Sequence, residues 1–146
     1  MAQPIVLIVF YSRHGAVETL ALATAVGAVQ GRALIRMRRL PDPDPTQTIL
    51  KFPESAEDLR RMHKEYVGPA EADLVAADAI VFASPSDFVP SGLADFFKLH
   101  ERLTTTGKLE GKVIRIITAP DSSAAPDAIE HATEEGRRLA EMLKSG

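Results

Sequence analysis

Short apolar runs alternate along this chain with longer segments of mixed polarity. The runs 5–10 and 79–84 are continuously aliphatic or aromatic, a pattern typical of strands covered on both faces of a parallel sheet. The run 33–40 begins apolar and then alternates with arginines, and Arg115 interrupts the apolar run 113–118. We therefore expect four strands, with the first in the centre of the sheet and the second and fourth nearer its edges.

Apolar residues recur at helical spacing in the segments between and after these strands. This periodicity predicts helices over 17–29, 93–103 and 126–143, the first ending at Gly31 and the second by Gly107. The strands alternate with these helices. The pattern therefore predicts one doubly wound α/β domain.

The segment between the second and third strands departs from this alternation. Proline removes a backbone donor and fixes φ, so a proline-rich segment favours a loop over a helix or a central strand. Four prolines lie in this segment, Pro41, Pro43, Pro45 and Pro53. Ser55 and Asp58 then have the spacing of a capping-box variant, which predicts a short, highly charged helix reaching Tyr66.

Composition narrows the classes of function. The chain has 146 residues, 45% hydrophobic and 25% charged, which is typical of a folded globular domain. Its net charge of −3 does not favour nucleic acid as a partner, and the absence of cysteine excludes disulfides, thiolate metal sites and a cysteine nucleophile. The run 5–10 is too short for a signal peptide or a membrane span, so we expect a cytoplasmic protein without a membrane partner.

The turn after the first strand is the strongest candidate site. In a doubly wound sheet, ligands bind beyond the carboxyl ends of the strands, here the loops after Phe10, Ser84 and Thr118. In the first of these loops, residues 12–17 (hereafter the phosphate loop) offer backbone N–H groups, the Ser12 hydroxyl and a helix N-terminus, which together can bind a phosphate. The alternative is an ordinary strand-to-helix turn that Ser12 caps.

Other polar residues give weaker signals. The histidines outside the phosphate loop lie in separate predicted helices without i,i+4 partners, so we expect no metal site. The serines lack a neighbouring base and acid, and we expect no catalytic side chain. The arginines at 36, 38 and 39 could bind a nucleotide phosphate, although protection of a strand end and pairing with acidic helices is the simpler interpretation.

Three segments carry a family resemblance. The motif Tyr-Ser-x-x-Gly-x-x-Glu-Thr at 11–19, the stretch 71–86 and the stretch 107–113 resemble the flavodoxin-like NAD(P)H:quinone oxidoreductases of the WrbA family. This resemblance implies a flavodoxin-like sheet of order 2-1-3-4, noncovalently bound FMN, NAD(P)H as co-substrate, a quinone-type acceptor and a homo-oligomer. The residues that it assigns to the cofactor are Ser12, Arg13, His14, Gly15, Ala16 and Val17 at the phosphate, and Ser86, Asp87 and Phe88 beside the flavin ring.

The chain departs from the family pattern in three places. Asp87 puts a carboxylate where the family has a cation, and the loop 119–126 lacks the family's glycines. The family's fifth strand is missing, because the segment 127–144 already resembles its last helix. Two hypotheses therefore stand, an FMN-dependent quinone reductase and a flavin-free binding or scaffold protein.

The missing strand also bears on assembly. The strand 113–118 should form an open edge, so we expect a homo-oligomer with contacts from 93–103 or 129–143. The alternative is that the terminal helix folds back over that edge within one chain.

Overall fold

The computed structural model describes residues 3–42, 44–86, 90, 93–121 and 123–145. Four parallel strands form one sheet of order β2-β1-β3-β4. They are β1 (Ile5–Phe10), β2 (Leu34–Arg39), β3 (Ala79–Pro85) and β4 (Val113–Ala119). The predicted α/β class and strand order are confirmed.

The two central strands explain why their sequences are apolar throughout. All of β3 and all but the first residue of β1 are buried. Because side chains alternate across a strand, Val6 and Ile8 face one layer of helices, while Leu7 and Val9 face the other.

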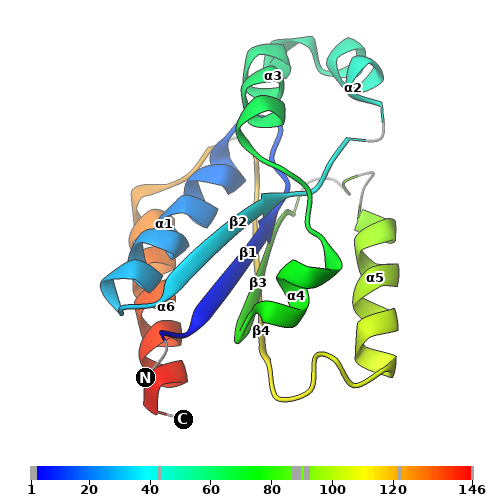
Figure 1. Cartoon of the computed structure of the whole chain (residues 1–146). Coiled ribbons are helices and arrows are strands. Elements are labelled where there is room, and N and C mark those ends of the chain that lie inside the picture. The colour runs from blue at the N-terminus through cyan, green and yellow to red at the C-terminus, as the bar shows by residue number, and fades with distance from the viewer. Residues whose placement is uncertain (1–2, 43, 87–89, 91–92, 122, 146) are drawn as a thin grey trace.

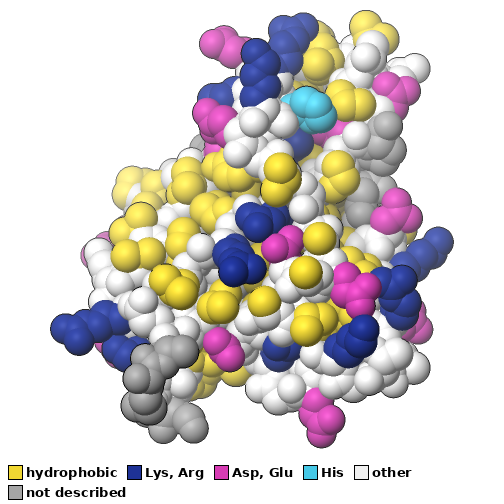
Figure 2. Space-filling model, in the orientation of Figure 1, with side chains coloured by type: hydrophobic (Ala, Val, Ile, Leu, Met, Phe, Trp, Pro, Cys, Tyr) yellow, Lys and Arg dark blue, Asp and Glu magenta, His cyan; other side chains and the backbone are white. Residues whose placement is uncertain are grey.

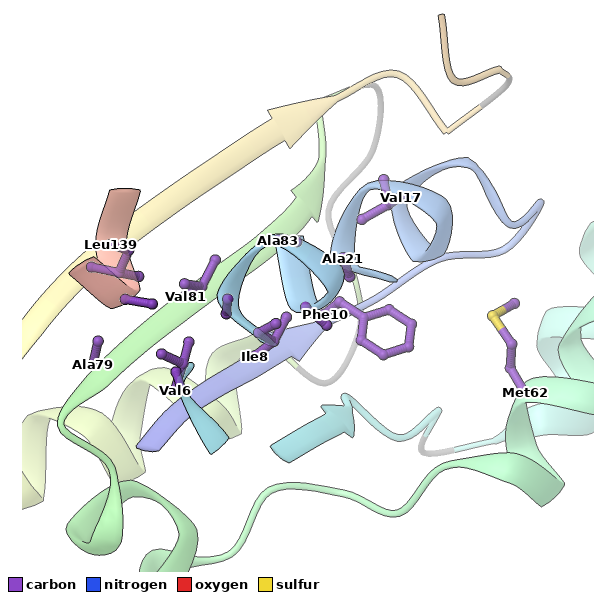
Figure 3. Close-up of a cluster of buried hydrophobic side chains, with 14 residues drawn as sticks. Val6, Ile8, Phe10, Val17, Ala21, Met62, Ala79, Val81, Ala83 and Leu139 are labelled. Atoms are coloured by element: carbon purple, nitrogen blue, oxygen red, sulfur yellow. The ribbon is translucent and has the colours of Figure 1, made fainter. Parts of the chain in front are cut away.

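One face of the sheet is covered by α1 (Ala16–Gln30) and α6 (Pro126–Ser145), which lie side by side (Figure 1). Figure 3 shows the cluster beneath them, where Ile8 and Phe10 of the sheet meet Val17 of α1. The predicted first helix, its end at Gly31 and the proline that opens the last helix are confirmed.

The other face is covered by α4 (Glu71–Ala76) and α5 (Leu93–Thr105) (Figure 1). Phe96 of α5 stacks on Phe82 of β3, with 5.3 Å between ring centroids, and is buried, whereas its neighbour Phe97 is 52% exposed. The sequence pattern predicts α5 but gives no signal for the two-turn helix α4.

The proline-rich segment corrects the sequence prediction of a loop. It contains α2 (Pro45–Lys51) and a 3₁₀ turn at Pro53–Ser55, followed by α3 (Ala56–Glu65). Helix α2 forms because Pro45 occupies its first turn, where no N–H is needed, and the Asp44 carboxylate accepts a hydrogen bond from the backbone N–H of Gln47 at 3.2 Å.

The predicted capping box of α3 does not form. Ser55 precedes the helix, as expected, but its hydroxyl donates to the carbonyl of Phe52 at 2.8 Å instead of capping α3. The 3₁₀ turn supplies this nearer partner. In Figure 1, α2 and α3 lie beyond the carboxyl ends of the strands, above the turn that leads into α1.

Strand β4 lies at an edge of the sheet, as predicted. Its side chains Ile114 and Ile116 are 38% and 69% exposed. Helix α6 packs beside α1, and Val113 and Ile117 of β4 join the apolar cluster that contains Leu139 of α6. The terminal helix therefore covers part of one face of β4, while Ile114 and Ile116 stay exposed.

The described surface carries mixed charge. Acidic and basic side chains intermingle on the face that Figure 2 shows. Among the described residues, no helix has both the length and the apolar character needed to cross a membrane. Nor do those residues bring three or more metal-ligating side chains together.

Candidate anion-binding site

The phosphate loop is built at the carboxyl end of the central strand β1. The backbone N–H of Tyr11 still donates to the carbonyl of Ala83 at 3.1 Å, so the chain leaves the sheet in register with β3. Gly15 then takes a left-handed conformation, with φ of 92°, immediately before α1. Its N–H donates to the Ser12 hydroxyl oxygen at 2.9 Å, which closes the turn.

Four donors of this loop converge on one carboxylate, that of Asp121. The Ser12 hydroxyl donates to Oδ1 at 2.6 Å, and the N–H of Val17 donates to the same oxygen at 3.0 Å. The N–H groups of Arg13 and His14 donate to Oδ2 at 2.5 and 2.9 Å. The loop is therefore an anion-binding site, and the chain's own carboxylate fills it.

Asp121 is fully buried, with an exposed fraction of 0%. Burial of a carboxylate is costly unless hydrogen bonds replace its water shell, and here both oxygens accept two hydrogen bonds each. A second anion cannot share these donors, because two unit charges 4 Å apart repel by about 4 kcal/mol at an effective dielectric constant near 20. Any other anion must take the place of the Asp121 carboxylate.

The Arg13 and His14 side chains of the phosphate loop contact residues outside the loop. The Arg13 guanidinium is stacked 3.7 Å from the ring centroid of Phe52, and His14 Nε2 lies 4.0 Å from the Glu54 carboxylate. The loop therefore acts on an anion through its backbone and Ser12. Of the other predicted residues, Ala16 and Val17 are buried and begin α1.

Glu18, in the first turn of α1, binds side chains in and directly after α3. Arg61 donates to both oxygens of this carboxylate, at 2.6 and 2.9 Å, and the Tyr66 hydroxyl donates at 2.8 Å. Burial alone raises the pKa of Glu18, but the hydrogen bonds from Arg61 and Tyr66 outweigh it, so this pKa lies below its ordinary value. Burial, and next the hydrogen bond to the negatively charged Glu18, raise the pKa of Tyr66.

Two of the clustered arginines have structural partners. Arg38 binds Asp73 of α4 through Nε at 3.0 Å, and Arg39 donates to the carbonyl of Ser12 at 3.1 Å and to Asp42 at 3.2 Å. These contacts favour strand-end protection over nucleotide binding. Through its hydrogen bond to the Ser12 carbonyl, Arg39 also holds the phosphate loop in place.

The predicted ring-side residues are described only in part. Ser86 is exposed, and its N–H donates to the carbonyl of Ala119 at 2.9 Å, which joins the ends of β3 and β4. Asp87 and Phe88 lie outside the described residues, so their assignment stays a prediction. The site is therefore described on its phosphate side.

Asp121 is the functional residue that the sequence analysis missed. In the loop after β4, the sequence shows the absence of the family's glycines but gives no local reason to assign a role to Asp121. A signal was present, because the carboxyl ends of parallel strands meet at one edge of the sheet. An acidic residue two positions beyond β4 can therefore reach a cluster of N–H donors after β1.

Comparisons with known proteins relate the chain to one class of enzymes. No family model matches the chain. It is 32% identical over 116 residues to an NAD(P)H dehydrogenase (quinone) of Archaeoglobus fulgidus, covering 78% of this chain and 60% of the relative. It is 33% identical over 115 residues to the protein of that name from Gluconacetobacter diazotrophicus, covering 74% and 52%. The chain thus spans between half and 60% of these curated relatives.

Solved structures support the fold. An archaeal flavodoxin superposes with a TM-score of 0.62 at 11% identity, covering 96% of this chain and 99% of that one. The flavodiiron protein of Giardia intestinalis superposes with a TM-score of 0.66 at 14% identity, covering 99% of this chain and 37% of that one. The chain is therefore a flavodoxin-like protein and a distant homologue of the NAD(P)H dehydrogenases (quinone).

Proposed function

We propose that this protein is an FMN-binding oxidoreductase that passes electrons from NAD(P)H to a quinone-type acceptor. The observation that carries the proposal is the convergence of the Ser12 hydroxyl and three backbone N–H groups on a single anion at the start of α1. The distant homology to NAD(P)H dehydrogenases (quinone) supplies the reaction class. FMN, when bound, supplies the hydride and electron chemistry.

The donor set suits a phosphate monoester. Its donors are the neutral backbone and one hydroxyl at a helix N-terminus, which replace the hydration shell of a phosphate without a paired cation. The loop cannot hold a phosphate and the Asp121 carboxylate at the same time. The proposal therefore requires that the FMN phosphate take the position of that carboxylate, while the loop backbone keeps its shape.

Flavin titration tests this proposal. We expect FMN to bind and riboflavin, which lacks the phosphate, to bind much more weakly in a fluorescence titration. Ser12→Ala removes one donor and should weaken FMN binding, because a doubly charged phosphate gains more from this hydrogen bond than the Asp121 carboxylate that it displaces. Thr105→Ala, at the exposed end of α5, is the control, because it also removes one hydroxyl but lies outside the phosphate loop, and it should bind FMN as the wild type does.

The enzyme assay then tests the reaction. Protein loaded with FMN should oxidise NAD(P)H with a quinone as acceptor, and the Ser12→Ala variant should lose activity in proportion to its lost flavin. Equal affinity of the wild type for FMN and riboflavin would contradict the phosphate site. Bound FMN without NAD(P)H oxidation would contradict the oxidoreductase.

A second candidate is a flavin-free binding or scaffold protein. It is favoured by one observation, namely that the phosphate loop already holds a buried carboxylate. The colour of the purified protein separates the candidates. Flavin absorbance near one equivalent, or uptake of added FMN, supports the oxidoreductase, whereas a colourless protein that takes up no FMN supports the scaffold.

A further inference from the structure

We infer that Asp121 is an internal ligand of the phosphate loop, a tethered carboxylate that a phosphate must displace before it can bind. This inference rests on the proposed function for the identity of the natural ligand, but the carboxylate's own role is tested separately below. Asp121 then lowers the affinity of the site for phosphate, although it makes no contact with the bound phosphate.

The number of donors that Asp121 occupies distinguishes it from an ordinary helix cap. Four donors of the loop point at this one side chain, and both of its oxygens are used. An ordinary N-cap satisfies one or two N–H groups from the residue immediately before the helix. Asp121 instead comes from a loop more than 100 positions away, as the Ser12 hydrogen bond with its sequence separation of 109 shows. It therefore acts as a ligand from elsewhere in the fold.

The Asp121 carboxylate is anchored close to the phosphate loop. Asp121 follows β4 by two residues, and the carbonyl of Ala119 at the end of that strand accepts the N–H of Ser86. The carboxylate is thus held close to the loop, at a high effective concentration.

The expected consequence is a lowered affinity for phosphates. When only a fraction of molecules has the site open, the apparent dissociation constant rises by the inverse of that fraction. If Asp121 closes nine in ten molecules or more, its removal tightens phosphate binding at least about tenfold. The same removal exposes four donors and lowers the stability of the ligand-free protein.

Asp121→Asn and Asp121→Ser test the inference, with Asp127→Asn as the control. Asp127 is also acidic and lies nearby, but it is exposed in the first turn of α6. We expect both Asp121 variants to unfold at lower urea concentration than the wild type without ligand. They should bind inorganic phosphate and FMN at least about tenfold more tightly. The control should match the wild type in both measurements.

The outcomes separate this inference from the proposed function. If wild type and Asp121 variants bind FMN equally, the inference is overturned and the proposed function stands. If the variants gain affinity for inorganic phosphate but no protein binds FMN, the inference stands and the proposed function is overturned. If no protein binds either ligand, the carboxylate is a permanent cap and both are overturned.

A measurement on the wild type guards against variants that fail to fold. Titration with inorganic phosphate, followed by amide NMR, should shift the N–H signals of Arg13, His14 and Val17. It should shift those of residues 123–125 in parallel, because Asp121 leaves the loop. Shifts in the phosphate loop without shifts in 123–125 would overturn the inference.

Discussion

Gly15 holds the one backbone conformation in the phosphate loop that other residues reach only with strain. Its φ is 92°, and the nearest heavy atom to an added Cβ would be Glu18 Oε1 at 3.8 Å, so space is not the obstacle. We expect Gly15→Ala to lower the free energy of unfolding by about 1–2 kcal/mol, the cost of a left-handed conformation for an L-residue. Urea denaturation measures this.

Gly68→Ala is the matched control for Gly15→Ala. Gly68 has no positive φ, and an added Cβ would meet Pro41 Cδ at an ordinary 3.5 Å. Its replacement should change the free energy of unfolding by less than about 1 kcal/mol. A loss at Gly15 no larger than the loss at Gly68 would contradict the strained turn.

Glu18 gives the fold a dependence on pH. Its pKa is lowered in the folded chain, because hydrogen bonds from Arg61 and Tyr66 outweigh burial. A carboxyl with a lowered folded pKa contributes stability above its unfolded pKa and loses it as pH falls through the folded value. Wild-type stability should therefore decline below pH 4.5, the ordinary value for this carboxyl.

The variant Glu18→Gln isolates this contribution. It cannot ionise, so its free energy of unfolding should be lower than that of the wild type at pH 7 and should fall less steeply between pH 5 and pH 3. Glu57→Gln, at an exposed position of α3, should keep the wild-type slope. If the free energy of unfolding of wild type and Glu18→Gln fell equally steeply with pH, Glu18 would not be the source of the pH dependence.

At the scale of elements, helices α1 and α6 touch through two glycines. A Cβ on Gly27 would lie 1.8 Å from the carbonyl oxygen of Thr133, and one on Gly136 would lie 2.0 Å from that of Thr24. These are backbone atoms, so relief requires the helices to separate. We expect Gly27→Ala and Gly136→Ala each to cost about 3 kcal/mol in denaturation experiments.

Glu130→Ala, on the exposed face of α6, controls for the change of helix composition. It should cost less than about 0.5 kcal/mol. Tolerance of alanine at both glycines would show that the two helices do not pack as closely as described.

Elements with a strong pattern could be predicted from the sequence, and elements set by local chemistry could not. The buried strands β1 and β3 and the periodic helices follow from hydrophobic spacing alone. Helix α2 could not be predicted in this way, because a proline-rich segment is typical of a loop. Pro45 nevertheless fits the helix, since it lies in the first turn. Helix α4 is six residues long, too short for periodicity to identify.

The candidate site shows the same division. The phosphate loop could be predicted, because a hydroxyl, a glycine and a helix start follow one another in the chain. The ligand of that loop could not be predicted in the same way. Asp121 meets Ser12 only through the order of the strands, and local spacing carries no information about a contact between residues so far apart.

For the molecule as a whole, assembly stays a prediction. Among the described residues, apolar side chains are exposed at β4, with Ile116, and along α1, where Val26 and Val29 are 52% and 54% exposed. An open, apolar strand edge favours pairing with another chain, so we expect a homo-oligomer. Light scattering coupled to size exclusion should give a mass above the 15.8 kDa of one chain.

Ile116→Lys tests whether the β4 edge forms the contact. A lysine on an edge strand blocks pairing, and the position is 69% exposed, so the fold should tolerate it. We expect the variant to be monomeric, with Val26→Lys as the parallel test of the α1 surface. A wild-type mass of 15.8 kDa across micromolar concentrations would contradict the oligomer.

We propose that the phosphate loop binds the phosphate of FMN through its backbone. Amide NMR of the wild-type chain, titrated with FMN and separately with riboflavin, tests it most directly. We expect FMN to shift the N–H signals of Arg13, His14 and Val17 and riboflavin to leave them in place. If FMN did not shift these N–H signals, or if riboflavin shifted them equally, the phosphate loop would not be the binding site of the FMN phosphate.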